Sequence, residues 1–347
     1  MTIELGQGTG PLRGLKVVEI AGIGPGPHAC MILADLGADV IRVERPGGQA
    51  LAGGATMLLN RGRPSVALNL KDPEAAKVVL DLVKDADVLV EGMRPGVCER
   101  LGIGPDDCHA VNPKLVYGRM TGWGQDGPLA QAAGHDMNYI AITGALFGLG
   151  QDKSRPHFPT NLVGDFGGGS TYLVIGILAA VIKARESGSG CAMEIAQSDA
   201  AAAFDWYRSE SFKAYERPES EVTGNAADGY ERRAPAIAGM RGGVRYQLYA
   251  SADGHVLFMA SEQHFWKSFC AAVDRSDMFE RWPGSEYGDH ARGNREMQAE
   301  LTEIFRGRTT AEWVQFGIDV DVPIAPVNTP QNLQDDPQFA ARFSWIP

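Results

Sequence analysis

The feature that most constrains the fold is an alternation of short apolar strands and helices in the first 120 residues. The run LKVVEIAG (15–22) is rich in β-branched residues and predicts a buried strand. HACMILADLGA (28–38) predicts a helix that Gly37 closes, and DVIRVERP (39–46) predicts a second strand. Strand, helix and strand form a βαβ unit, which requires parallel strands and a right-handed crossover.

The alternation continues along the chain. The segment from 72 to 86 predicts a helix in which Asp72 is the N-cap and Pro73 the first helical residue. Further strands are predicted at 65–70, 87–92, 114–120 and 191–197, and further helices at 95–102, 135–148, 168–186 and 200–215. The pattern therefore predicts an α/β fold with a doubly wound, Rossmann-like large domain over 11–205.

The second half of the chain has a different character. Residues 206–243 are charged and contain glycine and proline, which predicts a linker or loop region. A hairpin at 252–254 and helices at 262–273, 293–306 and 310–318 follow, which predicts a smaller α+β domain over 244–319. DVPIAPVNT (321–329) predicts a strand that returns to the large domain, so 320–347 is assigned to that domain.

Composition narrows the class of protein. With 347 residues the chain is too long for one simple core, and its net charge of -11 argues against a nucleic-acid partner. Five cysteines without a CxxC pair favour a reducing compartment. The longest apolar run, 172–182, is shorter than the roughly 20 residues of a membrane span. We therefore expect a cytoplasmic protein that has no membrane partner.

The loop GIGPGP (22–27) occupies the place of a dinucleotide fingerprint, after a strand and before a helix. The fingerprint G-x-G-x-x-G requires a third glycine, but Pro27 stands there. Pro25 and Pro27 also lack the N–H groups that would hold a pyrophosphate. We therefore expect no nicotinamide cofactor, and we expect the loop to form one wall of a ligand groove at the sheet edge.

Neither a G-x-S-x-G nor an H-E-x-x-H motif occurs, so no serine nucleophile or metal site is predicted.

Basic residues are concentrated in the first hundred positions of this acidic chain. Several of them follow predicted strands, so they are expected to converge at one sheet edge, where they would bind a phosphate-rich ligand. Taken singly, each is better explained as a solvated surface charge. The residues are Arg42, Arg45, Arg61, Arg63, Lys71, Arg94 and Arg100.

His135 and Asp165 are candidates for proton transfer. His135 begins a predicted helix, and Asp165 precedes three glycines and another predicted helix. At a helix N-terminus, unpaired backbone N–H groups would be available to an oxyanion. A base and an acid on two sides of a carbon next to a carbonyl can exchange its proton through an enolate. The simpler interpretation of Asp165, an N-cap, remains open at this point.

Four stretches resemble the α-methylacyl-CoA racemases, which belong to the family III CoA-transferase superfamily. The resemblance is strong from 11 to 200 and looser from 244 to 347. The stretches are LRGLKVVEIAGIGPGPHACMILADLGADVIRVERP, VEGMRPGVCERLGIGPDDC, YGRMTGWGQDGPLAQAAGHDMNY and NLVGDFGGGS.

This resemblance implies an interlocked homodimer in which the large domain of one chain and the small domain of the other form the site. It implies His135 and Asp165 as the acid–base pair, Glu262 as a support for the histidine, and no prosthetic group. Coenzyme A would enter as part of the thioester substrate. The contacts implied for it are Arg45, Leu68, Asn69, Leu70, Lys71, Gly92, Met93, Arg94, Arg100, Gly134, Asp136, Met137, Asn138 and Tyr139.

The resemblance predicts a racemase or epimerase that interconverts (R)- and (S)-2-methylacyl-CoA thioesters by 1,1-proton transfer. The alternative is a family III CoA-transferase, in which Asp165 is the nucleophile and carries a covalent intermediate. A transferase needs no second base, so His135 distinguishes the two. A third alternative is a non-catalytic protein that binds CoA esters.

Overall fold

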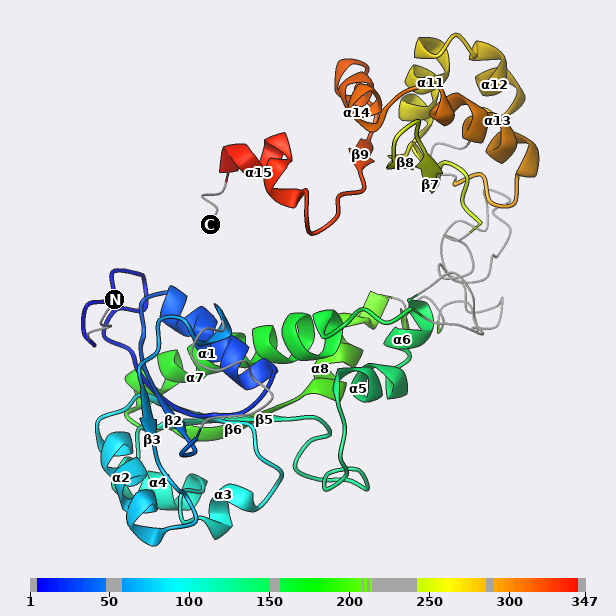
Figure 1. The fold of residues 1–347 in the computed structure, drawn as a ribbon. Coiled ribbons are helices and arrows are strands. Elements are labelled where there is room, and N and C mark those ends of the chain that lie inside the picture. Colours follow the sequence, from blue (N-terminus) through cyan, green and yellow to red (C-terminus); the bar gives the residue numbers. More distant parts are fainter. Residues whose placement is uncertain are drawn as a thin grey trace. The chain divides into compact units, whose positions relative to one another are not determined.

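The computed structural model describes residues 5–47, 58–149, 157–207, 209–210, 213, 242–284 and 290–342 (Figure 1). The chain divides into two compact units, Met1–Tyr207 and Arg208–Pro347. The division lies next to residue 206, where the linker was expected to begin. Most of the predicted linker, 206–243, lies outside the described residues.

The first unit contains a six-stranded sheet in the order β3-β2-β1-β4-β5-β6. Every pairing in it is parallel, as the alternation of strands and helices predicted. Its strands are β1 (Lys16–Ile20), β2 (Asp39–Glu44), β3 (Ser65–Ala67), β4 (Val88–Glu91), β5 (Val116–Thr121) and β6 (Cys191–Ala196). The unit is therefore an α/β fold with the strand order of doubly wound sheets.

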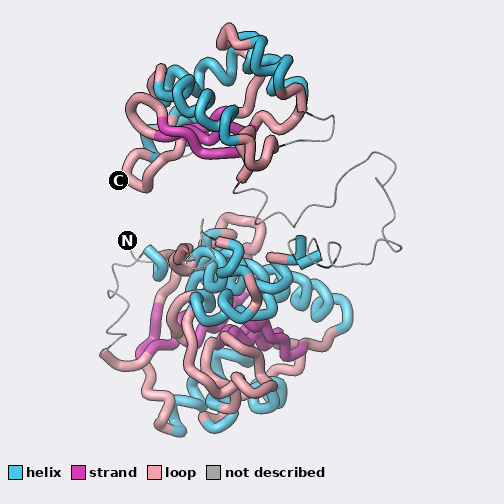
Figure 2. The backbone as a smooth tube through the Cα atoms, turned by 90° about the vertical axis from the view of Figure 1, so that its right-hand side faces the viewer, coloured by secondary structure: helices cyan, strands magenta, loops and turns pink. Residues whose placement is uncertain are grey.

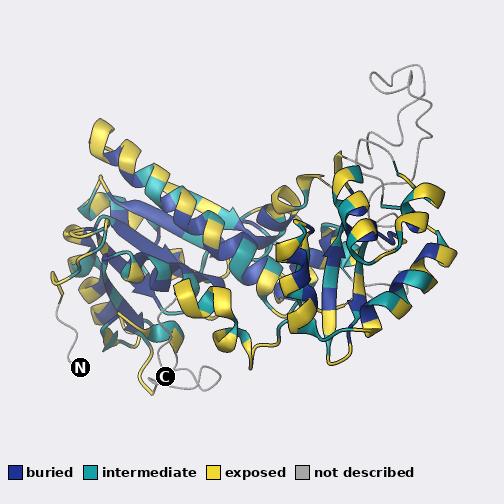
Figure 3. Ribbon diagram, turned by 90° about the horizontal axis from the view of Figure 1, so that it is seen from above, coloured by how far each residue is buried: buried dark blue, intermediate teal, exposed yellow. Residues whose placement is uncertain are grey.

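Helices cover both faces of this sheet (Figures 1 and 3). Successive strand residues point to opposite faces, so Val17 packs in a core with α1 and α7 and Val18 packs in a core with α2. The helical segments are α1 (Pro25–Asp35), η2 (Leu58–Asn60), α2 (Pro73–Lys84), α3 (Val97–Arg100), α4 (Pro105–Val111), α5 (Asp136–Ile142), α6 (Ala145–Gly148), the π-helical η3 (Leu162–Ser170), α7 (Thr171–Ser187) and α8 (Gln197–Phe204).

Two predicted helix boundaries are confirmed by their local chemistry. Asp72 caps α2, because its side chain accepts a hydrogen bond from the Glu74 N–H at 3.0 Å, and Pro73 is the first helical residue. Gly37 follows α1 with φ of 99°, and a Cβ there would lie 2.6 Å from the Gly10 nitrogen. Only glycine fits this position, so the chain can turn directly into β2.

One helical segment of the described chain, Leu162–Ser187, is long and apolar enough to cross a membrane by length and composition. It joins η3 to α7, so it extends beyond the apolar run considered in the sequence. Leu173 and Ile177 of α7 are fully buried in the core that includes the parallel strands. A core helix of an α/β domain passes the same test of length and composition, and the packing of α7 is that of a core helix.

The second unit contains an antiparallel sheet of β7 (Tyr246–Ala250), β8 (His255–Met259) and β9 (Ile324–Pro326), with helices on one face (Figure 2). The hairpin at 252–254 is confirmed. The strand predicted at 321–329 to return to the large domain instead pairs with β8, so this expectation was wrong. The helices are α11 (Gln263–Ala272), α12 (Ser276–Arg281), α13 (Arg295–Arg306), α14 (Thr310–Asp319), η6 (Leu333–Asp335) and α15 (Pro337–Arg342).

A buried ion pair fixes the end of β1. The side chains of Glu19 and Arg63 are 1% and 0% exposed, and they form a very short contact. Arg63 Nη1 also donates to the Pro27 carbonyl oxygen in α1 at 3.0 Å. Arg42 lies on the other side of Glu19, with 3.8 Å between its Nε and a carboxylate oxygen. This network connects β1, β2 and the first turn of α1.

We predict that Arg63→Leu lowers the free energy of unfolding by about 3–5 kcal/mol, because it leaves the Glu19 carboxylate buried with a weaker partner. Arg61→Leu is the matched control, since Arg61 pairs with Asp35 at the exposed surface and such pairs contribute about 0–1 kcal/mol. Urea denaturation measures both. Equal losses in the two variants would contradict a structural role for the buried pair.

Candidate active site

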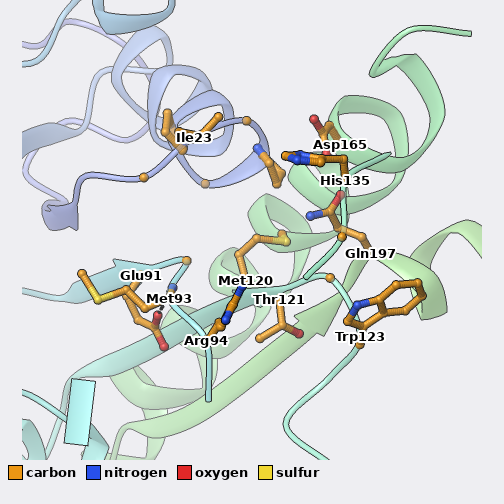
Figure 4. A pocket seen from close by; sticks show the side chains of 18 of the residues that line it. Ile23, Glu91, Met93, Arg94, Met120, Thr121, Trp123, His135, Asp165 and Gln197 are labelled. Atoms are coloured by element: carbon orange, nitrogen blue, oxygen red, sulfur yellow. Dashed lines mark hydrogen bonds between the residues drawn. The ribbon is translucent and has the colours of Figure 1, made fainter. Parts of the chain in front are cut away.

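A cleft of about 480 Å³ opens at the carboxyl ends of β1, β4 and β5 (Figure 4). Since β1 lies between β2 and β4, the strand order reverses at this point. Doubly wound sheets bind their ligands at such a reversal. The lining is formed by Ile20 to Pro27, Arg45, Val90 to Pro95, Met120 to Trp123, Ala130, Ala132 to His135, Tyr139, Asp165 and Gln197.

The glycine loop forms one wall of this cleft, as its place after a strand predicted. Gly24 has φ of 74°, a conformation that L-residues with a side chain rarely adopt. A Cβ on Gly24 would lie 3.1 Å from Asp165 Oδ2. The glycine therefore brings the backbone of the loop against the carboxylate. Pro25 follows as the first residue of α1.

Asp165 is not an N-cap. The π-helical segment η3 begins at Leu162 and Asn161 is its cap, so Asp165 lies inside the first turn. The N–H of Asp165 donates to Asp136 Oδ1 at 2.6 Å, and the N–H of Phe166 donates to the backbone carbonyl oxygen of Asn161 at 3.0 Å. These two N–H groups are therefore already bonded. Since η3 continues directly into α7, no helix begins after Asp165, which corrects the expectation of free helix N-terminal N–H groups there.

The surroundings of Asp165 favour its neutral form. Only 7% of the residue is exposed, and burial raises the pKa of its carboxyl above the ordinary value. The negative charge of Asp136 acts in the same direction. Asn161 Nδ2 donates to Asp165 Oδ2 at 2.5 Å and this lowers the pKa, as does the nearby His135. The result is a carboxyl group that holds its proton at a higher pH than a free aspartate.

His135 and Asp136 perform different tasks from adjacent positions. His135 is the N-cap residue of α5, its N–H donates to Asn138 Oδ1 at 3.0 Å, and its exposed side chain lines the cleft beside Asp165 (Figure 4). Asp136 is 3% exposed and accepts the bond from the Asp165 N–H. The sequence predicted the placement of His135 and Asp165 on one ligand site, and both line this cleft.

The contacts predicted for coenzyme A divide into two groups. Six of them line the cleft, namely Arg45, Gly92, Met93, Arg94, Gly134 and Tyr139. The others are not among the lining residues. These are Leu68, Asn69, Leu70 and Lys71 after β3, Arg100 at the end of α3, and Asp136, Met137 and Asn138 in α5.

The basic residues do not converge as a group. Arg42 pairs with Glu44 at 2.8 Å, Arg61 pairs with Asp35, and Arg63 pairs with Glu19. These three guanidinium groups therefore already have carboxylate partners. Of the seven basic residues, Arg45 and Arg94 line the cleft. The expected cluster is thus reduced to two arginines.

Glu262 belongs to the second unit. It is the N-cap residue of α11, and its backbone oxygen accepts a hydrogen bond from the Trp266 N–H at 3.1 Å. It is not among the residues that line the cleft of the first unit. Of the three predicted catalytic residues, His135 and Asp165 therefore belong to the first unit, where both line the cleft, and Glu262 belongs to the second unit.

His28 was assigned no role from the sequence, yet it contacts the segment that carries Asp165. Its Nδ1 lies 2.6 Å from Ser170 Oγ, and its ring lies 4.6 Å from that of Phe166. Burial, followed by Arg61 and Arg63, lowers the pKa of this histidine. His28 therefore fastens α1 to η3. No local pattern indicates this, because Ser170 is 142 positions away.

Three buried polar atoms on residues near His135 and Asp165 have no hydrogen-bond partner among the described residues. They are Trp123 Nε1, Asp136 Oδ2 and Gln197 Oε1. Proteins leave few such groups unpaired, and Trp123 and Gln197 line the cleft, which is therefore suited to a polar ligand. In the described part of the chain, no group of three or more His, Cys, Asp or Glu residues is arranged to hold a metal ion.

Comparison with known proteins adds a family to this geometry. A sequence model described as CoA-transferase family III matches residues 12–347. The α-methylacyl-CoA racemase of Homo sapiens is 33% identical over 96% of this chain and 82% of that protein. A probable fatty acyl-CoA transferase of Mycobacterium tuberculosis, Rv3272, is 31% identical over 95% of this chain and 86% of that protein.

Solved structures agree with the sequence comparison. A crystal structure of Rv3272 superposes with a TM-score of 0.78 at 28% identity, over 96% of this chain and 87% of that chain. The succinyl-CoA:glutarate CoA-transferase of Homo sapiens is 28% identical over 94% of this chain and 74% of that protein. Racemases and transferases are thus both similar to this chain.

We predict that Asn161→Gly raises the pKa of Asp165 further, because the variant removes the donor that stabilises the carboxylate. Glycine also accepts the φ of 60° found at Asn161, so the backbone is not strained. Carbon-13 NMR titration of the Asp165 carboxyl measures the effect. Asn138→Gly is the control, since Asn138 bonds to the His135 N–H instead. An unchanged titration midpoint in Asn161→Gly would contradict the assignment.

Proposed function

This chain belongs to CoA-transferase family III, and we propose that it is a racemase or epimerase of 2-methylacyl-CoA thioesters. The observation that carries the proposal is the presence of His135 and Asp165 in one cleft. The two side chains come from different elements, α5 and η3. An acid and a base carried by different elements can act on opposite faces of one carbon.

In one direction, neutral His135 takes the proton from the α-carbon, and protonated Asp165 gives a proton to the opposite face. The raised pKa of Asp165 supports this role, because the acid must hold its proton until the carbanion forms. In the reverse direction the Asp165 carboxylate takes the proton and the His135 imidazolium gives one. Each complete event inverts the configuration and leaves the pair in the opposite protonation state.

The enolate oxygen requires donors, and we propose the first N–H groups of α5 for this role. Asp136 and Met137 follow the cap residue His135, and N–H groups at such positions have no acceptor within the helix. Aimed at a developing negative charge, they would lower the barrier to enolate formation. The helix-terminal donors expected from the sequence are thus proposed at α5 instead of the helix after Asp165.

Coenzyme A is proposed to lie along the cleft with its phosphates at Arg45 and Arg94. Figure 4 shows Arg94 and Met93 well separated from His135 and Asp165, which leaves the length of the cleft for the pantetheine arm. Guanidinium groups suit phosphate because they donate paired hydrogen bonds. Calorimetry on Arg45→Leu tests this placement, and CoA affinity equal to that of the wild type would contradict it.

We also propose an interlocked homodimer, in which Glu262 of one chain supports His135 of the other. The support for this is the resemblance of the sequence to the racemases. Under this arrangement, each site combines a large unit from one chain and a small unit from its partner.

A CoA-transferase is the second candidate. The similarity to Rv3272 and to the human succinyl-CoA:glutarate enzyme favours it, as does a buried carboxylate beside a glycine loop. In that reaction the Asp165 carboxylate attacks the thioester carbonyl and the thiolate of coenzyme A departs. His135 would have no chemical step to perform.

We predict that the wild type converts a single enantiomer of a 2-methylacyl-CoA into a mixture in D₂O, with deuterium at the α-carbon. His135→Ala and Asp165→Ala should each lower the rate of inversion by about 10²–10⁴, the usual contribution of a positioned acid or base. Chiral chromatography with mass spectrometry measures both. Transfer of CoA to an added carboxylate, without inversion and independent of His135, would establish the transferase instead.

We predict that Asp165→Ala and Glu262→Ala complement each other when they are co-expressed. A mixed dimer has one site with both residues intact, so activity should return to about a quarter of the wild-type value if chains pair at random. The two homodimers serve as controls. If Glu262 instead acts within its own chain, each chain of the mixed dimer lacks one of the two residues. No site is then intact, and no activity would return.

A further inference from the structure

Gln197 occupies a position in the cleft that its place in the sequence did not indicate. The sequence assigned it to the end of a strand, but it is the first residue of α8, directly after β6. It is 6% exposed and lines the cleft together with His135 and Asp165. Figure 4 shows its amide group pointing into the cleft near those two side chains.

The amide of Gln197 is not used to hold the fold together. Its Oε1 is fully buried and has no hydrogen-bond partner among the described residues. No hydrogen bond from Nε2 to a described residue is found either. Leaving the buried Oε1 unpaired costs about 1–3 kcal/mol, which shows that packing within the fold does not satisfy this amide. Its donor, Nε2, is the atom that can bond to an oxygen of a ligand in the cleft.

Close packing fixes Gln197 relative to Asp165. A Cβ on Gly169 in η3 would lie 3.0 Å from Gln197 Cγ and 3.4 Å from Pro25 Cβ. The glycine thus lets the stem of Gln197 and the start of α1 press against the same helical segment that carries Asp165. A glutamine whose stem is packed in this way presents its amide in a restricted direction, as a preorganised donor must.

Other donors near Asp165 are already bonded or missing. The N–H of Asp165 bonds to Asp136, and the N–H of Phe166 bonds to Asn161. Pro25 and Pro27, on the facing wall, have no N–H. Among the side chains that line the cleft, the Gln197 amide therefore remains available to an oxygen of the ligand, as does Trp123 Nε1.

We infer that Gln197 Nε2 donates a hydrogen bond to the thioester oxygen of the substrate and so stabilises the enolate. The inference rests on the proposed acyl-CoA substrate. When the base removes the α-proton, the electrons of the C–H bond form the C=C bond and the thioester oxygen takes the negative charge. Protonation at carbon reverses these changes, so nothing is oxidised or reduced. Gln197 would share the oxygen with the first N–H groups of α5.

Binding of two analogues tests the inference without relying on turnover. One is a 2-methylacyl-CoA thioester, and the other is the matching S-alkyl thioether, in which CH₂ replaces the carbonyl. We expect the wild type to prefer the thioester and Gln197→Leu to reduce that preference about 3–10-fold, the effect of one hydrogen bond. Affinity for the thioether should stay unchanged, because it lacks the oxygen.

Gln125→Leu is the matched control, because the buried Nε2 of Gln125 has no partner among the described residues but Gln125 does not line the cleft. Gln197→Met keeps the side-chain volume if leucine disturbs folding. Equal weakening of both analogues would reduce Gln197 to a packing residue and overturn the inference. So would a wild type that binds the thioether as tightly as the thioester.

The catalytic consequence is measured separately. Loss of one oxyanion donor lowers kcat by about 10²–10³, so Gln197→Leu should slow inversion while the KM changes little. If the wild type transfers CoA instead of inverting the substrate, the proposed reaction fails. The binding comparison would still decide by itself whether Gln197 bonds to the thioester oxygen.

Discussion

The hydrogen bond from the Asp165 N–H to Asp136 Oδ1, at 2.6 Å, is the interaction on which the site depends. It joins η3 to α5 inside the protein, where a backbone donor without a partner would be costly. Because His135 directly precedes Asp136, the same bond fixes the histidine and the aspartate in one cleft. It also places the Asp136 charge where it raises the pKa of Asp165.

The parallel sheet determines where this pair can act. The reversal of strand order next to β1 opens the cleft, and Gly24 allows the loop after β1 to approach the Asp165 carboxylate. The buried pair of Glu19 and Arg63 connects that loop to the sheet through the Pro27 carbonyl. Stability and chemistry thus share one region, because the network that holds β1 also positions the wall of the cleft.

The sequence predicted those features that depend on neighbouring residues. Hydrophobic periodicity located the parallel strands, and Asp72 with Pro73 identified the start of α2. A similar helix start is present at α4, where Pro105 is the first residue and the Asp107 side chain accepts a hydrogen bond from the Gly104 N–H. That helix could have been predicted.

Contacts between distant residues could not be predicted in this way. The bond between His28 and Ser170, the pairing of β9 with β8, and the approach of Gln197 to η3 all depend on the packed structure. The arginines illustrate the limit. The concentration of basic residues suggested that Arg42 and Arg63 were available to a ligand, but Glu44 on β2 pairs with Arg42 and the buried Glu19 on β1 pairs with Arg63.

The central claim is that two bases act on opposite faces of one carbon, and the fate of each pure enantiomer in D₂O tests it most directly. A chain that lacks one base should still exchange the α-proton of the enantiomer that faces the other base. His135→Ala should therefore exchange one enantiomer and Asp165→Ala the other, each without inversion. The account would be contradicted if both variants failed to exchange the α-proton of either enantiomer. It would also be contradicted if the wild type exchanged neither.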